Sequence, residues 1–182
     1  VRRYARGRTV LNTFCYTGGF SVYALAGGAR EVCSIDSSER AVALADANVR
    51  LNFGEEAPHT SLAVDAVEYL KDIGDRYDMI ILDPPAFTKS RRTANNAEKG
   101  YKEINLRAMR LLPRGGYLAT ASCSHFMPSE RFERMLRSAA ADAGVELRQI
   151  EVRTQASDHP ILWNVPETDY LKFYLFLSLI HI

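Results

Sequence analysis

The 182-residue sequence has few cysteines, no long apolar run and little net charge, and each shortage excludes a class of protein. No apolar run approaches the roughly 18 residues of a membrane span, and no charged-then-apolar segment resembling a secretion signal opens the chain. Three cysteines, an odd number without metal-ligand spacing, argue against a disulfide framework and a metal site and for a reducing cytoplasm. With 47% hydrophobic and 25% charged residues, the composition is typical of one globular domain with a sizeable core.

The sequence also lacks the three spaced glycines of a dinucleotide-binding fingerprint. Instead, an apolar run from Val10 stops at the adjacent pair Gly18-Gly19, and a helical pattern follows. This arrangement is typical of the cofactor turn after the first parallel strand of an α/β protein. Gly18 and Gly19 are expected to remove side chains where a ligand lies close to the backbone.

Three further apolar runs each close on an aspartate. Residues 31–35 end in Asp36, residues 61–64 in Asp65 and residues 78–82 in Asp83, which places these carboxylates along one edge of a parallel sheet. At the tip of the second strand, Asp36 can accept hydrogen bonds from the ribose of an adenosine-containing cofactor. Alternatively, Asp36 with Ser37 and Ser38 only caps the next helix.

The alternation of strand and helix patterns predicts an α/β fold with a mostly parallel, doubly wound sheet, finished by a hairpin-like pair of strands. Residues 87–100 read as a flexible loop. Asn48 lies on an otherwise apolar helix face, either as a satisfied core group or as a contact near the cofactor. The expected helices are 20–26, 38–51, 66–73, 101–112 and 129–143, with Ser129 as N-cap of the last, and the later strands are 117–121, 145–154 and 170–177.

The net charge of +1 is unevenly distributed, because residues 84–114 alone carry a net charge of +6. A cationic segment directly after Asp83 suits a polyanionic substrate. The alternative is a solvated, partly helical surface.

Cys123 stands at the end of a predicted strand, beside the strand that ends in Asp83. Side chains at this edge face the ligand crevice, so Cys123 is a candidate nucleophile, with a structural thiol as the alternative. Cys33 is expected in the core, and Cys15 is expected to be structural within the cofactor turn.

Seven stretches then combine into a recognisable series: Leu11–Ser21, Asp36-Ser37, Asp83–Phe87, Gly100–Asn105, Ser122–Ser124, Asp158–Pro160 and Pro166–Lys172. The series resembles a class I S-adenosylmethionine-dependent methyltransferase, and more narrowly the large-subunit (23S) ribosomal RNA cytosine-5 methyltransferase family. The resemblance implies a Rossmann-like, seven-stranded sheet with an antiparallel last strand. It also implies S-adenosylmethionine as the cofactor and ribosomal RNA as the partner, with neither membrane nor metal involved and the oligomeric state open, a homodimer included.

The resemblance implies roles for residues at the cofactor. Asp36 with Ser37 holds the ribose, Asp65 with Ala66 flanks the adenine, and Asp83 with Pro84 lies between cofactor and target. The methionine end is wrapped by the first turn, through Phe14, Tyr16, Thr17, Gly18, Gly19 and Phe20.

At the target, Asp83 and the Pro84 carbonyl are expected to accept hydrogen bonds from a flipped-out base, on which Phe87 or Tyr101 stacks. The remaining substrate contacts implied are Pro85, Lys89 and Lys102.

Carbon-5 of cytosine is not nucleophilic, so the resemblance implies that the Cys123 thiolate attacks C6 first. Lys102 or an arginine of the cationic segment is expected to supply the neighbouring positive charge that a thiolate needs. His125, Asp158 and His159 are candidates for the base that removes the C5 proton.

Two alternatives stay open. A purine N-methyltransferase also suits an acidic residue followed by Pro-Pro and needs no thiol, and a non-catalytic cofactor- or RNA-binding module needs none of this chemistry. A nicotinamide dehydrogenase is disfavoured by the missing third glycine.

In that family a PUA-type RNA-binding domain and a connecting segment precede the catalytic domain, which we therefore assign to residues 1–176. Residues 177–182 match the in-frame translation of a sequencing-library transposon end. They are expected to be a non-native tail outside the fold.

Overall fold

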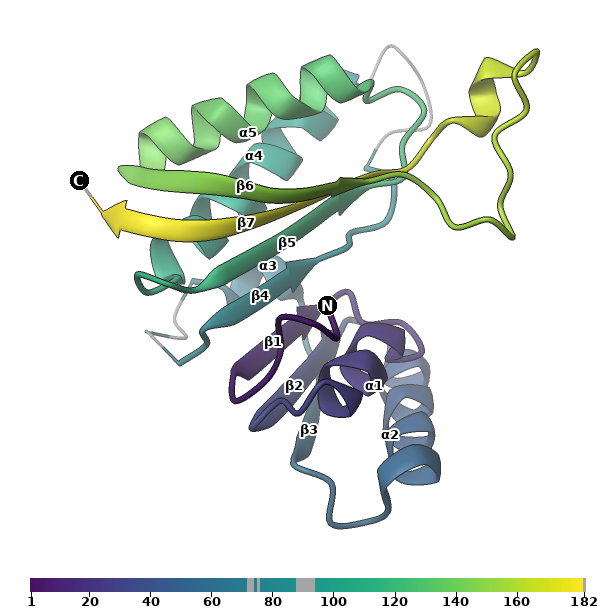
Figure 1. The fold of residues 1–182 in the computed structure, drawn as a ribbon, viewed down its shortest axis with the longest axis vertical. Helices are drawn as coiled ribbons and strands as arrows, with labels where there is room; N and C mark the ends of the chain where they lie inside the picture. The colour runs from purple at the N-terminus through teal and green to yellow at the C-terminus, as the bar shows by residue number, and fades with distance from the viewer. Residues whose placement is uncertain (72–73, 75, 88–93, 182) are drawn as a thin grey trace.

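A seven-stranded sheet in the order β3-β2-β1-β4-β5-β7-β6 organises the protein, with helices on both faces (Figure 1). The computed structural model describes residues 1–71, 74, 76–87 and 94–181. The strands are β1 (Thr9–Thr13), β2 (Glu31–Asp36), β3 (His59–Ala63), β4 (Met79–Leu82), β5 (Tyr117–Ser122), β6 (Val145–Arg153) and β7 (Lys172–His181). The helices are α1 (Gly19–Ala26), α2 (Glu39–Phe53), α3 (Ala66–Tyr69), α4 (Ala94–Leu111) and α5 (Ser129–Ala143), followed by a 3₁₀ turn at Pro166–Thr168.

The first five strands in sheet order are parallel, and β7 is antiparallel to both β5 and β6. The predicted fold, a doubly wound and mostly parallel sheet with an antiparallel last strand, is therefore confirmed. All residues of β1 and β4 are buried, because helices or packed segments cover both faces of the central strands.

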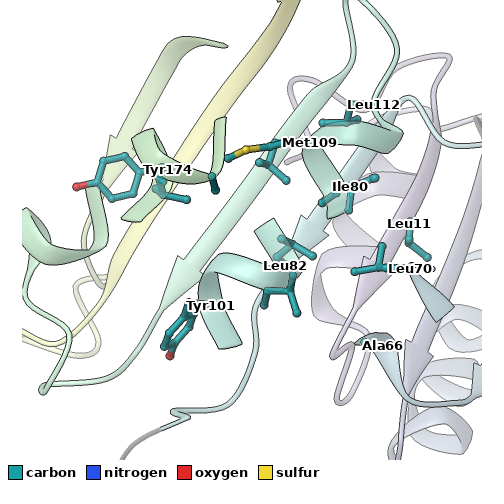
Figure 2. Close-up of a cluster of buried hydrophobic side chains, with 14 of the residues drawn as sticks. Leu11, Ala66, Leu70, Ile80, Leu82, Tyr101, Met109, Leu112 and Tyr174 are labelled. Atoms are coloured by element: carbon teal, nitrogen blue, oxygen red, sulfur yellow. The ribbon is translucent and has the colours of Figure 1, made fainter. Parts of the chain in front are cut away.

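The strands divide their side chains between two apolar clusters. Leu11 and Ile80 point toward α3, α4 and α5, whereas their neighbours Val10 and Ile81 point toward α1 and the segment before β1. Figure 2 shows the first cluster, where Tyr101 of α4 lies near Leu82 and Met109 of α4 lies near Ile80. This packing fixes α4 against the strands that carry the candidate site.

A buried row of polar groups ties the first half of the sheet to its helices. Asn12 donates to the Ser21 hydroxyl at 2.8 Å, and the Ser21 and Ser34 hydroxyls lie 2.6 Å apart. The row continues from Ser34 to the His59 ring at 2.7 Å, and the other ring nitrogen of His59 lies 3.3 Å from Asp46 of α2. Hydrogen bonds between buried polar groups of this kind favour one arrangement of β1, β2 and α2.

Two local predictions were wrong. Helix α4 begins at Ala94, so residues 94–100 are helical rather than loop. Pro128 rather than Ser129 is the N-cap of α5, and Ser129 is its first helical residue. Gly144 ends α5 in the left-handed conformation, as expected.

Residues 177–181 are part of β7, which corrects their exclusion from the fold. Leu177 pairs with Tyr117, and Ser178 is buried and exchanges backbone hydrogen bonds with Gly115 and Gly116 at 2.7 and 2.8 Å. The origin of this segment stays a prediction.

Two helical leucines, one buried and one exposed, allow the contribution of the core to the free energy of unfolding to be tested. Leu136 of α5 is 4% exposed, whereas Leu51 of α2 is 84% exposed. We expect Leu136→Ala to lower the free energy of unfolding by about 2–5 kcal/mol, because it leaves a cavity in the core. The matched control Leu51→Ala should change it by less than about 0.5 kcal/mol. Urea denaturation checks both, and equal effects would contradict the packing described.

Candidate active site

The turn between β1 and α1 has an unusual backbone. Phe14 and Tyr16 have positive φ angles of 54° and 47°, and Gly18 has a φ of 77°. Non-glycine residues in this region cost about 1–3 kcal/mol each and cluster at functional sites. The turn is braced by hydrogen bonds from the Cys15 amide to the Ile35 carbonyl and from the Gly18 amide to the Cys15 carbonyl, at 3.0 and 2.8 Å.

The two glycines of this turn serve different purposes. A Cβ on Gly18 would lie 2.8 Å from the Cβ of Ala45, so α2 itself excludes a side chain there. A Cβ on Gly19 would meet nothing within 4 Å. The expectation that both glycines make room for a ligand is therefore corrected for Gly18, whose constraint comes from its φ and from helix packing.

The Asp36 carboxylate joins the turns after β1 and β2. Its Oδ2 accepts from the Tyr16 amide at 3.1 Å and its Oδ1 from the Ser38 amide at 3.0 Å, while Ser37 is exposed beside it. Ser38 rather than Asp36 caps α2, through its hydroxyl and the Ala41 amide at 3.3 Å. Because each carboxylate oxygen has a second lone pair, Asp36 keeps acceptor capacity for a ribose diol.

Asn48 of α2 belongs to the site rather than to the core. Its side-chain amide donates to the Thr17 carbonyl at 2.8 Å and so holds the first turn.

Phe20 lies on the α1 face of the sheet. Its ring stacks on Phe173 of β7, with centroids 6.3 Å apart and an angle of 24°.

After β3, Asp65 is exposed and Ala66 is buried. The Asp65 carboxylate caps α3 by accepting from the Glu68 amide at 2.9 Å. Ala66 is 3% exposed and packs in the first core cluster beside Leu70 (Figure 2). The expected contact of Ala66 with the adenine does not fit this burial.

After β4, Asp83 is half-buried, and burial raises the pKa of its carboxyl above the usual range. Pro84 is buried and Pro85 is exposed. The Phe87 ring meets Phe14 edge-on, with centroids 6.5 Å apart, and packs on Tyr101 at 4.7 Å. The turns after β1 and β4 are therefore in aromatic contact.

Tyr101 and Lys102 do not occupy the positions expected of substrate contacts. Tyr101 is fully buried between Phe87 and Phe132, and its hydroxyl accepts from the Ser122 hydroxyl at 3.1 Å. It supports Phe87 instead of offering a face to a base. Lys102 forms an ion pair with Asp142 of α5 at 2.6 Å. Lys89 lies outside the described residues.

Cys123 directly follows β5 and is half-buried, whereas Cys15 and Cys33 are 6% and 3% exposed. Burial raises the pKa of the Cys15 thiol to about 12, so Cys15 stays neutral. Cys123 is thus the accessible thiol of the three.

Lys172 is the site residue that sequence reasoning missed. It is 6% exposed, it pairs with Ser122 across β5 and β7, and its ammonium donates to the Ser124 and Tyr170 carbonyls at 2.6 and 2.7 Å. Burial lowers the pKa of Lys172 to about 8, and electrostatic interactions with Cys123 and Asp169 oppose this shift. The sequence did contain a signal for this residue, because Lys172 is the first residue of Lys172–Leu177, an otherwise apolar run within the predicted strand 170–177.

The three candidate bases are spread over two segments. His125 follows Cys123 by two residues and is exposed, its ring meeting Phe126 edge-on at 5.5 Å. His159 and Asp158 lie in the segment between β6 and β7, where the His159 ring is 3.4 Å from the Tyr170 hydroxyl.

Within the described residues, no cluster of three His, Cys, Asp or Glu side chains is placed to hold a metal ion. Over the same residues, every helix is too short or too polar to cross a membrane.

Comparison with known families gives one match over most of the chain. The model of the family described as S-adenosylmethionine-dependent methyltransferase matches residues 1–162.

Several curated relatives carry the name ribosomal RNA large subunit methyltransferase I. The protein from Tolumonas auensis is 47% identical over 173 residues, covering 93% of this chain and 44% of the relative. The protein from Erwinia tasmaniensis is 46% identical, covering 94% and 44%. The chain thus spans less than half the length of these relatives.

Among solved structures, SMU.776, assigned as a methyltransferase and solved with SAH, superposes with a TM-score of 0.82 at 26% identity, covering 95% of this chain and 46% of that one. A Streptococcus mutans protein assigned as a SAM-dependent methyltransferase gives the same TM-score and identity, covering 97% and 46%.

The two adjacent glycines offer a matched test of the turn. Gly18→Ala should lower the free energy of unfolding by more than about 1 kcal/mol, because its φ is positive and Ala45 blocks the new methyl group. Gly19→Ala should be neutral or stabilising by up to about 1 kcal/mol, since it replaces glycine in the first turn of a helix. Thermal and urea denaturation of both variants check this, and a reversed order would contradict the turn geometry.

Proposed function

The chain belongs to the S-adenosylmethionine-dependent methyltransferase family, and from this premise we propose that it methylates C5 of a cytosine in large-subunit ribosomal RNA. The printed name of the curated relatives supports the RNA substrate. The observation that carries the cytosine-5 chemistry is a half-buried thiol, Cys123, which interacts electrostatically with Lys172, whose buried ammonium bonds the carbonyl of the next residue, Ser124. In this proposal the catalytic domain comprises residues 1–176 together with the remainder of β7, residues 177–181, and acts in the cytoplasm.

The residues of the first two turns fit the cofactor, which supplies an electrophilic methyl group on a sulfonium. The open space over Gly19 and the exposed ring of Tyr16 leave room beside the backbone of the β1–α1 turn. Asp36, already fixed by two amides, keeps lone pairs for the ribose hydroxyls, with Ser37 beside it. Asp65 is proposed to border the adenine. The remaining residues proposed for the methionine end are Phe14, Thr17, Gly18 and Phe20.

Asp83 and Pro84 are proposed to hold the target base. The sequence suggested that Asp83 accepts a hydrogen bond from the base. Because burial raises the pKa of its carboxyl, in the proposal Asp83 instead donates a hydrogen bond to the ring nitrogen N3 of cytosine. The Pro84 carbonyl accepts from the exocyclic amine, and the two consecutive prolines stiffen the turn that presents it. Phe87 covers the base, supported from below by Tyr101. A base reaches this pocket only after it leaves its stack.

Cys123 is the proposed nucleophile. Its thiolate adds to C6, forming a carbon–sulfur bond and making C5 electron-rich enough to accept the methyl group. A base then removes the C5 proton, and the electron pair released expels the Cys123 thiolate. His125 is the candidate base nearest to Cys123 in the chain.

Lys172 is the proposed counter-ion of this thiolate. The sequence suggested Lys102 for this role, but Lys102 is paired with Asp142. The Lys172 ammonium is held by the Ser124 and Tyr170 carbonyls, which carry no formal charge, and both Cys123 and Asp169 interact with it electrostatically. Burial strengthens its attraction to a nearby anion.

Replacing Cys123 separates the proposal from its alternatives. Cys123→Ala should abolish methyl transfer to unmodified ribosomal RNA while retaining S-adenosylmethionine binding, measured by calorimetry. The wild-type protein should form a covalent adduct with RNA containing 5-fluorocytidine, visible as a mass increase, because fluorine cannot leave as a proton does. Retained methyl transfer by Cys123→Ala would favour a purine N-methyltransferase, and cofactor binding without transfer or adduct would favour a binding module.

Replacing Lys172 tests the counter-ion. We expect Lys172→Gln, which can still donate to the two carbonyls, to slow alkylation of Cys123 by iodoacetamide at neutral pH by roughly tenfold, equivalent to about 1.4 kcal/mol of lost attraction. Because the pKa of Lys172 is lowered to about 8, its charge is lost as pH rises through that value. The wild-type and variant rates should therefore converge at higher pH. Lys71→Gln, at an exposed ion pair with Glu68, is the control, and superimposable pH profiles for Lys172→Gln and wild type would refute the role.

A further inference from the structure

An exposed apolar segment lies at the same edge of the sheet as Cys123. Residues 154–171 connect β6 to β7 and project beyond the sheet, as Figure 1 shows. Within this arm, which we call the 154–171 arm, Trp163 is 97% exposed and its neighbours Ile161, Leu162 and Val165 are 36–49% exposed. A run of exposed apolar side chains that includes a tryptophan is typical of a binding surface.

The arm presents Trp163 on an ordered turn. The Val165 amide donates to the Leu162 carbonyl at 2.9 Å, which closes the turn around Trp163. The Thr168 hydroxyl accepts from the Leu162 amide and lies 2.7 Å from the Val165 carbonyl, to which it donates. Gln155 ties the base of the arm by donating to the Thr168 carbonyl. Because these bonds fix the backbone that carries Trp163, the turn loses little conformational freedom on binding.

Trp163 borders a cleft of about 410 Å³ between the arm and the start of α5. His125 and Lys172 line the same cleft, and the Lys172 ammonium bonds the carbonyl of Ser124, the residue after Cys123. The cleft is therefore continuous with the proposed catalytic edge.

The polar lining suits the edge of a base better than a phosphate. Glu130 and Asp169 contribute carboxylates to the cleft, which repel a phosphate but accept hydrogen bonds from exocyclic amino groups of bases. The exposed indole supplies a stacking face that every base can use. When a target base leaves its stack, its neighbours in the strand become available to such a face.

We propose that this cleft binds an unpaired nucleobase of the RNA substrate next to the target cytosine, with Trp163 stacked on that base. The inference rests on the proposed RNA substrate and adds a second base-binding position to it. The arm then fixes the strand on one side of Cys123 while Asp83 and Phe87 hold the target on the other.

Trp163 is the single tryptophan of the chain, so its fluorescence reports on this cleft without a label. Titrating the protein with a single-stranded RNA of about ten nucleotides should quench that fluorescence saturably. Trp163→Ala should bind the same RNA, carrying a terminal fluorophore, roughly 5- to 150-fold more weakly, the range that stacking of one base supplies. Trp163→Phe should retain most of the affinity, because a phenyl ring also stacks.

Leu51→Ala, which removes an exposed apolar side chain of α2 far along the chain, is the matched control and should bind the RNA like wild type. Binding of labelled RNA without quenching, or with equal affinity for Trp163→Ala, would overturn the proposal. A shift of the tryptophan emission with protein concentration alone would also overturn it, because a second copy would then cover the arm.

Methyl transfer is measured separately from quenching. Quenching of the Trp163 fluorescence without methyl transfer would support the base-stacking cleft and contradict the proposed reaction. Methyl transfer without quenching would contradict base binding in the cleft and support the proposed reaction.

Discussion

The registration of four parallel strands is the constraint on which the site depends. Thr13 at the end of β1 pairs with Ile35 of β2 and with Leu82 of β4, and Leu82 pairs with Thr120 near the end of β5. The strands therefore end together, and the residues that follow them meet at one edge. A slip of one residue between two strands would turn the side chains of one of them to the opposite face and would move its chain end out of line.

This constraint explains how much of the site the sequence could predict. Buried parallel strands read as continuous apolar runs, so the residues that follow them, such as Asp36, Asp83 and Cys123, can be located without a structure. The direction of a helical side chain is harder to predict. Tyr101 and Lys102 are neighbours on α4, but successive helical residues point about 100° apart, so Tyr101 enters the core while Lys102 reaches Asp142.

Contacts between residues far apart in the chain could not be predicted from local sequence patterns. The partner of the Ser124 carbonyl is Lys172, 48 residues along the chain, and only the antiparallel pairing of β5 with β7 brings them together. Similarly, the reason for Gly18 lies in Ala45, on another helix. The motif showed that a glycine is needed at that position, and only the packing shows which atoms require it.

The place of β7 between β5 and β6 has a consequence for synthesis of the protein on the ribosome. The parallel strands and Cys123 emerge first, whereas Lys172 emerges some fifty residues later and reaches its place only when β7 inserts. A nascent chain with its parallel strands already paired still lacks the ammonium beside its accessible sulfur. On the proposed role of Lys172, activation of the Cys123 thiol therefore waits until β7 has completed the sheet.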